Sequence, residues 1–270
     1  MLKKILIAIS AIIIVLISTA IWGFYIEPNI LIANRISIQD KELSGIKVVF
    51  VSDLHLCKDD ESRINRIISK INNENADIVL LGGDYMCADM QGKTTMAPQQ
   101  IVEHLVKIKG KYGVFTVFGN HDSAFHIIKK MSDLLSKGNI TILQNKNTTV
   151  QIGEKKICIA GIADFSSGLH KINQTFEGTA KPIVAFTHSP DLFNKIPQNV
   201  NILFAGHTHG GQVAIPFWGP LAKPRHLVGK YVKGFYEFEG RKMFVSKGCG
   251  NSHINVRFCC IPEIVVATFE

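Results

Sequence analysis

The stretch "NILFAGHTHGGQ", residues 201–212, joins an apolar run to a loop that contains two histidines among glycines. The run from Asn201 to Ala205 is short and apolar, which is typical of a buried β-strand. His207 and His209 follow directly after it, two positions apart. Two explanations fit this ending: a surface turn that happens to contain histidines, or a pair of metal ligands. Only the rest of the chain distinguishes them.

Similar apolar runs recur along the chain and indicate its fold class. They cover residues 47–52, 77–82, 113–118, 156–161, 183–187, 243–246 and 264–269. Because they are nearly continuously apolar, we expect strands that are buried on both faces. Helical patterns occupy 61–73, 98–109 and 123–137, and in the first of these the isoleucines recur at the spacing of one helix face. This alternation of strands and helices predicts a layered α/β sandwich.

Polar side chains follow five of these runs, at the point where each strand ends. The endings are Asp53-Leu54-His55, Gly83-Asp84, Gly119-Asn120-His121-Asp122, His188 and His207-Thr208-His209. Ligand sites in open α/β sheets gather at the carboxyl ends of strands, so these side chains are expected to converge. Aspartate, histidine and asparagine, without thiolate, are donors that suit Mn, Fe or Zn. The sequence therefore favours the second explanation for His207 and His209.

The five endings, in this order across residues 47–210, resemble the motifs of the calcineurin-like metallophosphoesterases: D-x-H, G-D, G-N-H-[DE], a lone histidine and G-H-x-H. The resemblance implies a four-layer α/β/β/α sandwich, in which two mixed sheets are flanked by helices. It also implies an enzyme, a metal-dependent phosphoric ester hydrolase. Its cofactors would be two divalent metal ions, drawn from Mn, Fe and Zn.

The same resemblance assigns a role to each motif residue. Asp84 would bridge the two ions. The first ion would also be held by Asp53, His55 and His209, and the second by Asn120, His188 and His207. His121 would face the substrate phosphate as a catalytic residue, and Asp122 would orient it. Gln212 and Arg225 are further candidates for substrate binding.

The N-terminus carries a long apolar segment, from Ile5 to Ile26, without a charged residue. As a helix it would be roughly 33 Å long, enough to cross a bilayer. The expected organisation is a transmembrane anchor over 1–26, a connector over 27–45 and a metallophosphoesterase domain over 46–270. A cleaved signal peptide, with Ser18-Thr19-Ala20 at the cleavage site, is the alternative.

Two stretches, "GHTHGGQVAIPFWGP" and "YVKGFY", carry a resemblance to the membrane-associated branch of the family that contains YkuE-like and YaeI-like phosphodiesterases. That branch includes enzymes acting on UDP-2,3-diacylglucosamine. We therefore expect hydrolysis of a phosphodiester or pyrophosphate bond in a phosphorylated small molecule or a lipid-linked substrate. A non-catalytic membrane scaffold is disfavoured because every motif position is filled. A nuclease, and with it a nucleic-acid partner, is disfavoured by the anchor and by the absence of an extra DNA-binding domain.

Membrane orientation is left open by the sequence. Lys3 and Lys4 predict a single-pass protein of the cell membrane with its N-terminus inside and the domain outside. A UDP-linked substrate would require the opposite side. The net charge of +8 suits phosphates or an acidic membrane surface without indicating nucleic acid. The oligomeric state is not determined.

Three further features have simple structural interpretations. Small buried residues are the default expectation for all six cysteines, because their spacing shows no disulfide framework; an even number could still form bridges outside the cytoplasm. His253 follows a strand end and could line the site, but a structural loop is the favoured expectation. Residues 216–236, which mix aromatic and basic side chains, fit either an ordinary solvated loop or an interfacial loop that rests on lipid.

Overall fold

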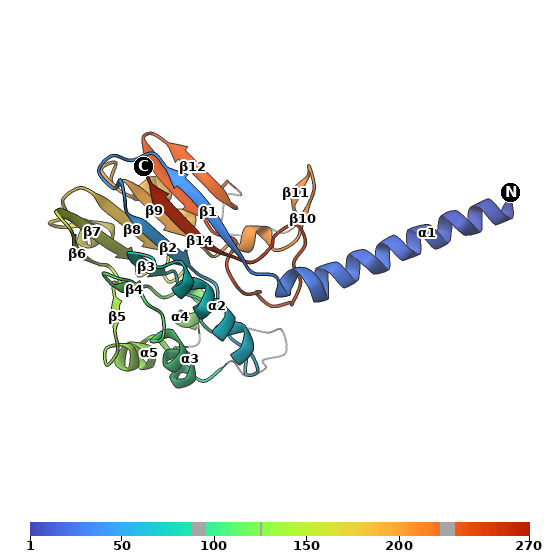
Figure 1. The fold of residues 1–270 in the computed structure, drawn as a ribbon, viewed down its shortest axis with the longest axis horizontal. Coiled ribbons are helices and arrows are strands. Elements are labelled where there is room, and N and C mark those ends of the chain that lie inside the picture. Colours follow the sequence, from blue (N-terminus) through green and yellow to red (C-terminus); the bar gives the residue numbers. More distant parts are fainter. Residues whose placement is uncertain (88–95, 125, 222–229) are drawn as a thin grey trace.

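The computed structural model describes residues 1–87, 96–124, 126–221 and 230–270, so Arg225 lies outside the described residues. Two six-stranded mixed sheets pack face to face, and helices cover their outer faces (Figure 1). The first sheet has the order β1-β14-β2-β3-β4-β5 and the second β12-β13-β9-β8-β7-β6. This arrangement confirms the predicted fold class of two mixed sheets flanked by helices.

The strands of the first sheet are β1 (Ile32–Ile38), β2 (Lys47–Val51), β3 (Ile78–Leu81), β4 (Val114–Thr116), β5 (Ile140–Ile142) and β14 (Glu263–Phe269). Those of the second are β6 (Lys146–Ile152), β7 (Lys155–Ile162), β8 (Ile183–Thr187), β9 (Ile202–Ala205), β12 (Gly234–Phe238) and β13 (Arg241–Val245). Strands β2 to β5 run parallel to one another, as do β7, β8, β9 and β13. Their carboxyl ends therefore share one edge of each sheet.

Helices α2 (Glu61–Asn73), α3 (Pro98–Leu105) and α5 (Ile128–Leu135) cover the first sheet. Helix α6 (Ile172–Phe176) and the 3-10 helix η3 (Pro190–Lys195) lie against the second. The expected isoleucine face of α2 is buried on the sheet. Between the sheets, Phe50, Leu80 and Phe115 pack in one cluster with Phe186 and Phe204. Burying each such side chain contributes about 1.5–3 kcal/mol, so this layer holds the sheets together.

Some elements differ from the sequence-based expectation. The helix expected over 123–137 is divided into α4 (Asn120–Ala124) and α5, so the loop after β4 can bend at the site. The stretch 27–45, for which a connector is expected, contributes β1, which pairs in parallel with β14. That pairing joins residues about 230 positions apart, which local patterns do not reveal.

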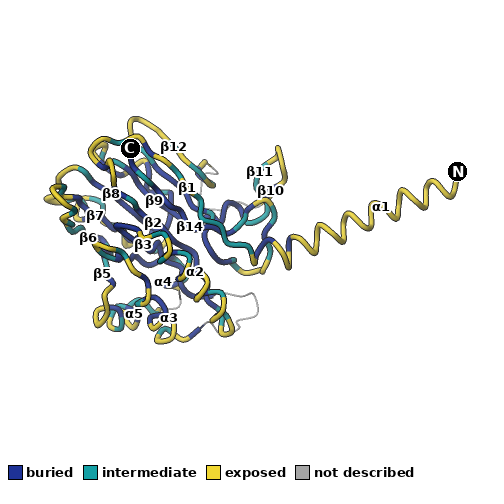
Figure 2. The backbone as a smooth tube through the Cα atoms, in the orientation of Figure 1, coloured by how far each residue is buried: buried dark blue, intermediate teal, exposed yellow. Residues whose placement is uncertain are grey.

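Helix α1 (Leu2–Ile21) extends away from the domain and is exposed along its whole length (Figure 2). It continues through a π-helical turn, Trp22–Ile26, and a 3-10 turn, Glu27–Asn29. The segment Leu2–Asn29 is long and apolar enough to cross a membrane, although an N-terminal signal sequence has the same properties. The end of this segment contacts the domain, where Arg257 donates its backbone N–H to Gly23 O at 2.9 Å.

Candidate metal centre

The ends of five parallel strands deliver the predicted ligands to one place. Asp53 and His55 follow β2, Asp84 follows β3, and Asn120 begins α4 after β4. From the second sheet, His188 follows β8, while His207 and His209 follow β9. Because the two sheets pack face to face with these ends at a common rim, all seven side chains meet there.

Asp84 lies at the centre of this cluster. Its Oδ2 atom is 3.2 Å from Nε2 of His188, 3.7 Å from Nε2 of His55 and 3.9 Å from Nε2 of His121. On one side of Asp84, Nε2 of His209 lies 3.5 Å from Oδ1 of Asp53 and 3.1 Å from Nε2 of His55. This is the group expected for the first ion.

On the other side of Asp84, His188 links the group expected for the second ion. Its Nε2 atom is 3.0 Å from Oδ1 of Asn120 and 3.1 Å from Nδ1 of His207. The side chains of Asp53, His55 and His209 could hold one ion, and those of Asp84, His188 and His207 another. The structure thus brings together every predicted ligand, in two groups that meet at Asp84.

The donor atoms fit a cation rather than a network of hydrogen bonds. Nδ1 of His55 donates to Met86 O at 3.0 Å, and Nδ1 of His188 donates to Gly82 O at 2.9 Å. Because a carbonyl can only accept, Nε2 is the atom of each ring that faces the Asp84 carboxylate, and in the neutral His55 ring this atom presents a lone pair. Among the described residues, no lysine or arginine forms an ion pair with Asp53 or Asp84. Buried carboxylates facing imidazole lone pairs call for a bound cation, and hard oxygen with imidazole donors suits a divalent metal.

The pKa shifts of the ligand histidines and of Asp84 also favour a bound cation. Burial lowers the pKa of His55 to about 3 and holds that of His209 well below its ordinary value, so both rings are neutral and able to act as ligands. Burial would also lower the pKa of His188, yet Asp84 raises it well above its ordinary value. Burial would raise the pKa of Asp84, but His188 and the neighbouring histidines hold it low. Asp84 therefore stays ionised and attracts cations.

The backbone is strained at the ligands themselves. Asp53, His55, Asp84, His207 and His209 all have positive φ values, between 42° and 71°. Such residues cost free energy and persist where the surrounding fold holds them, which is typical of functional sites. Glycine is required beside them, because a Cβ at Gly119 would clash with the Asp84 carboxylate and a Cβ at Gly206 with Ser52 and Asp53.

The profile of the calcineurin-like phosphoesterase family matches residues 46–211, more than half of the chain. This chain belongs to the calcineurin-like phosphoesterase family. The match confirms the predicted enzyme class, a metal-dependent phosphoesterase, and its matched residues include all five motifs.

Three relatives of this phosphoesterase share nearly its whole length. It is 28% identical to the uncharacterized metallophosphoesterase YkuE of Bacillus subtilis over 263 residues, covering 91% of this chain and 88% of YkuE. It is 28% identical to phosphodiesterase YaeI of Escherichia coli, covering 90% and 89%. It is 24% identical to UDP-2,3-diacylglucosamine pyrophosphatase LpxG of Chlamydia trachomatis, covering 91% of each. The predicted resemblance to the YkuE and YaeI branch is thereby confirmed.

His121 and Asp122 both lie beside the metal centre, but Asp122 does not make the expected contact with the His121 ring. The His121 ring faces a cleft of about 360 Å³, and its backbone N–H donates to Asp84 Oδ1 at 2.9 Å. The Asp122 carboxylate accepts backbone N–H groups of Asp84 at 2.8 Å, Tyr85 at 3.0 Å and Gly119 at 2.9 Å. Asp122 therefore ties the loops after β3 and β4 together through three backbone N–H groups, instead of orienting the His121 ring.

The wall of the cleft beside His121 includes residues that belong to none of the five motifs. The His253 ring lies 5.6 Å from that of His121, and His253 lines the cleft with Ser252. Its loop placement was expected, and its position in the wall of the cleft corresponds to the less favoured of the two alternatives, since no motif contains it. Gln212 also lines the cleft, yet its side chain bonds to the backbone of Ser252 and Ile254. Gln212 thus braces this wall.

Arg257, fully buried, supports the same wall and the metal centre behind it. Its guanidinium donates to the carbonyls of His209 at 2.9 Å, Lys247 at 2.8 Å and Cys260 at 3.1 Å, and also to Gly250 O. Nε donates to Asn251 Oδ1 at 2.8 Å. Arg257 therefore fixes the backbone of the ligand His209 to residues 247–260.

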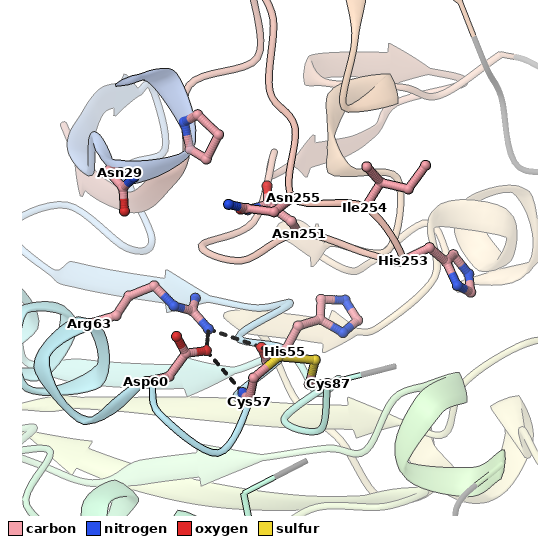
Figure 3. Close-up of a pocket in the computed structure, with 11 residues that line it drawn as sticks. Asn29, His55, Cys57, Asp60, Arg63, Cys87, Asn251, His253, Ile254 and Asn255 are labelled. Carbon is pink, nitrogen blue, oxygen red and sulfur yellow. Dashed lines mark hydrogen bonds and ion pairs between the residues drawn. A yellow bond between two sulfur atoms is a disulfide. The ribbon is translucent and has the colours of Figure 1, made fainter. Parts of the chain in front are cut away.

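A second cavity, of about 220 Å³, adjoins the metal centre at His55 and His253 (Figure 3). Cys57 and Cys87 line it and form a disulfide, which corrects the expectation that all cysteines are unpaired buried residues. The two residues are thirty positions apart, and only the pairing of β2 with β3 brings them together. The bond ties the loop that carries His55 to the loop that carries Asp84. Of the other four cysteines, Cys259 is exposed, which also departs from the expectation.

Proposed function

We propose that this chain is a membrane-anchored phosphoesterase that hydrolyses a phosphodiester or pyrophosphate bond with two divalent metal ions. Asp53, His55 and His209 would hold one ion, Asn120, His188 and His207 the other, and Asp84 would bridge them. The observation that most supports this is the position of Asp84 Oδ2, within 3.2–3.7 Å of His188 and His55, one from each group. Mn, Fe and Zn all suit this donor set.

When bound, such ions would offset the charge that develops on the phosphoryl oxygens. The residues of the chain would position the ions and the substrate and would transfer the proton. The rigid strand ends hold the donors in place, so little reorganisation is needed as the reaction proceeds. His121 lines the cleft with Nε2 3.9 Å from Asp84 Oδ2, and in its protonated form it would give a proton to the departing oxygen. His253, beside it, closes that side of the cleft.

Paired variants separate metal binding from proton transfer. Asp84→Ala should lose bound metal and nearly all activity, because neither ion keeps its shared ligand. His121→Ala should keep its metal and lose about 10²–10⁴-fold in turnover of bis(p-nitrophenyl) phosphate with added Mn²⁺. Asp133→Ala, which removes an exposed carboxylate from α5, is the matched control and should behave as the native chain does. Loss of metal from His121→Ala would show that the role proposed for His121 is wrong. Full activity of Asp84→Ala would refute the proposed metal centre.

We infer further that the domain lies on the outer side of the cell membrane. Helix α1 supports an anchor, and Lys3 and Lys4 favour an inside N-terminus. The Cys57–Cys87 disulfide supports the same orientation, because disulfides persist in oxidising compartments. The relative LpxG is named for a UDP-linked substrate. A substrate of that kind would require the domain on the cytoplasmic side. An outer active site instead favours a lipid phosphodiester or pyrophosphate without a nucleotide.

The exposed, free thiol of Cys259 allows this orientation to be measured. A membrane-impermeant maleimide added to intact cells should label Cys259, and a Cys259→Ser chain should take up no label. Labelling only after the cells are opened would place the domain on the cytoplasmic side, and a UDP-linked substrate would then be favoured again. Competition of the phosphodiesterase assay by single-stranded DNA would instead indicate a nuclease.

A further inference from the structure

A short hairpin beside the metal cleft exposes large apolar side chains. It consists of β10 (Ala214–Ile215) and β11 (Gly219–Pro220), which pair antiparallel. At its tip Phe217 is fully exposed, Trp218 is 86% exposed, and Leu221 next to the hairpin is 64% exposed. Phe217 also has a φ of 66°, an unusual conformation for a bulky residue. A contiguous apolar projection of this kind usually marks an interaction surface.

One segment of the chain joins this hairpin to the end of the N-terminal helix. On the hairpin side, Ala214 N donates to Phe258 O at 2.8 Å, and Phe258 N donates to Gln212 O at 3.0 Å. On the helix side, Arg257 N donates to Gly23 O, while the buried Glu27 carboxylate accepts the backbone N–H groups that follow Phe258. Residues 256–260 therefore hold the hairpin base and the helix end in one rigid unit.

Both projections leave the domain at the same end. In Figure 1, β10 and β11 stand at the end of the domain from which α1 departs. The helix end carries Trp22, Phe24 and Tyr25, all exposed. Aromatic residues of this kind are enriched where a membrane meets water. A bilayer that surrounds α1 would begin at these rings, and the hairpin tip lies at the same end.

We propose that the tip of the β10–β11 hairpin, through Phe217 and Trp218, inserts into the interface of the bilayer that α1 spans. The occupant of this surface is lipid, because the hairpin is fixed to an exposed apolar helix of membrane-spanning length. The inference rests on the proposed anchor and on the proposed phosphoesterase activity, and it extends both.

The position of the cleft then defines the substrate class. Gly211 and Gln212, which immediately precede the hairpin, line the cleft together with Asp84 and His121. With the hairpin in the interface, the cleft opens at the lipid surface. The substrate is therefore an amphiphile whose phosphate group lies at that surface, and it reaches the cleft without leaving the bilayer.

Tryptophan fluorescence tests the insertion without requiring activity. The chain has two tryptophans, so Trp22→Phe leaves Trp218 as the reporter and Trp218→Phe leaves Trp22. Each full-length variant is reconstituted into vesicles with lipids brominated on the acyl chains near the headgroup. We expect strong quenching of both reporters. Quenching of Trp22 alone would overturn the hairpin insertion and leave the anchor standing, whereas quenching of neither would remove the anchor as well. A blue-shifted but unquenched Trp218 would indicate a protein partner or a second copy of this chain, and would also overturn the proposal.

Kinetics test the consequence for the substrate. The double variant Phe217→Ser/Trp218→Ser is compared with Tyr112→Ser, which removes an exposed aromatic ring just before β4, at the opposite end of that strand from the site. The two substrates are hexadecyl p-nitrophenyl phosphate in the same vesicles and methyl p-nitrophenyl phosphate in solution.

For the double variant we expect kcat/KM to fall about tenfold on the hexadecyl ester, which corresponds to about a quarter to a half of the free energy of burying two aromatic side chains. Its activity on the methyl ester should be unchanged, as should both activities of Tyr112→Ser. An equal fall on both esters, or no fall on either, would contradict a role of the hairpin at the lipid surface. If the native chain hydrolyses neither ester, the proposed function fails, while the fluorescence result still decides the insertion.

Discussion

Replacement of Arg257 tests whether the cleft wall and the metal centre are held by one buried cation. Its guanidinium is fully buried and satisfies four backbone carbonyls, those of His209, Lys247, Gly250 and Cys260. Burial lowers its pKa to about 10, so the side chain still carries its charge at neutral pH. Arg257→Met would leave all four carbonyls without this donor.

The expected loss can be worked from these contacts. Gln212 N–H still donates to His209 O at 2.9 Å, so the carbonyls of Lys247, Gly250 and Cys260 lose their partner. A buried carbonyl without a partner costs about 1–3 kcal/mol, so three at the lower end of that range cost about 3 kcal/mol. Removing the buried charge offsets part of this cost, and the net loss of stability should be about 2 kcal/mol. For a chain of this size that lowers the midpoint of thermal unfolding by about 4–8 °C. Arg257→Lys keeps the charge but reaches fewer carbonyls, so about half of that loss is expected.

Thermal unfolding of the full-length chain in detergent, with a chelator present, measures the loss of stability in the absence of metal. Arg35→Met is the matched control, because Arg35 forms an exposed ion pair with Glu74 and should cost less than about 1 kcal/mol. Calorimetric titration with Mn²⁺ measures the functional part, and Arg257→Met should bind about 10–100-fold more weakly through its effect on His209. An Arg257→Met chain as stable as Arg35→Met, with native Mn²⁺ affinity, would refute this account.

Two further predictions concern the membrane-proximal contact and the disulfide. Glu27→Gln should destabilise the chain by about 1–2 kcal/mol, seen as a lower unfolding midpoint, because an amide replaces one of two oxygens that accept hydrogen bonds from Trp22 Nε1 and two backbone groups. A midpoint equal to that of the native chain would show that this contact is dispensable. In denaturant without reductant, four cysteines should take up iodoacetamide, and reduction should raise the number to six. Mass spectrometry counts the labels, and six labels before reduction would exclude the Cys57–Cys87 bond.

Much of the fold and the centre could be predicted from local patterns. The isoleucines of α2 recur at helical spacing and are buried as expected, because a helix on a sheet must hide one face. The eight expected strands are all present within a few residues of their expected bounds. Convergence of Asp53, Asp84 and His207 was predictable because parallel strands bring their carboxyl ends to one edge. None of these predictions depends on the conformation of the loops between the strands.

Other features depend on contacts between distant segments, and the sequence did not reveal them. Edge strand β1 forms only because the C-terminal strand β14 lies beside it. Asp122 meets three backbone donors because β3 and β4 are neighbours, and so it does not serve His121. The Cys57–Cys87 bond likewise requires two loops thirty residues apart to meet.

By itself, then, the sequence determined the α/β class, the buried strands and the set of side chains at the site, because hydrophobic periodicity and strand endings are local properties of the chain. Tertiary structure alone decided which groups form hydrogen bonds or ion pairs with each of those side chains. It also placed His253 in the wall of the cleft and Arg257 behind that wall, and it set the hairpin at the same end of the domain as α1. Hydrogen bonds and packing of this kind join segments more than two hundred residues apart, and no spacing within one segment encodes them.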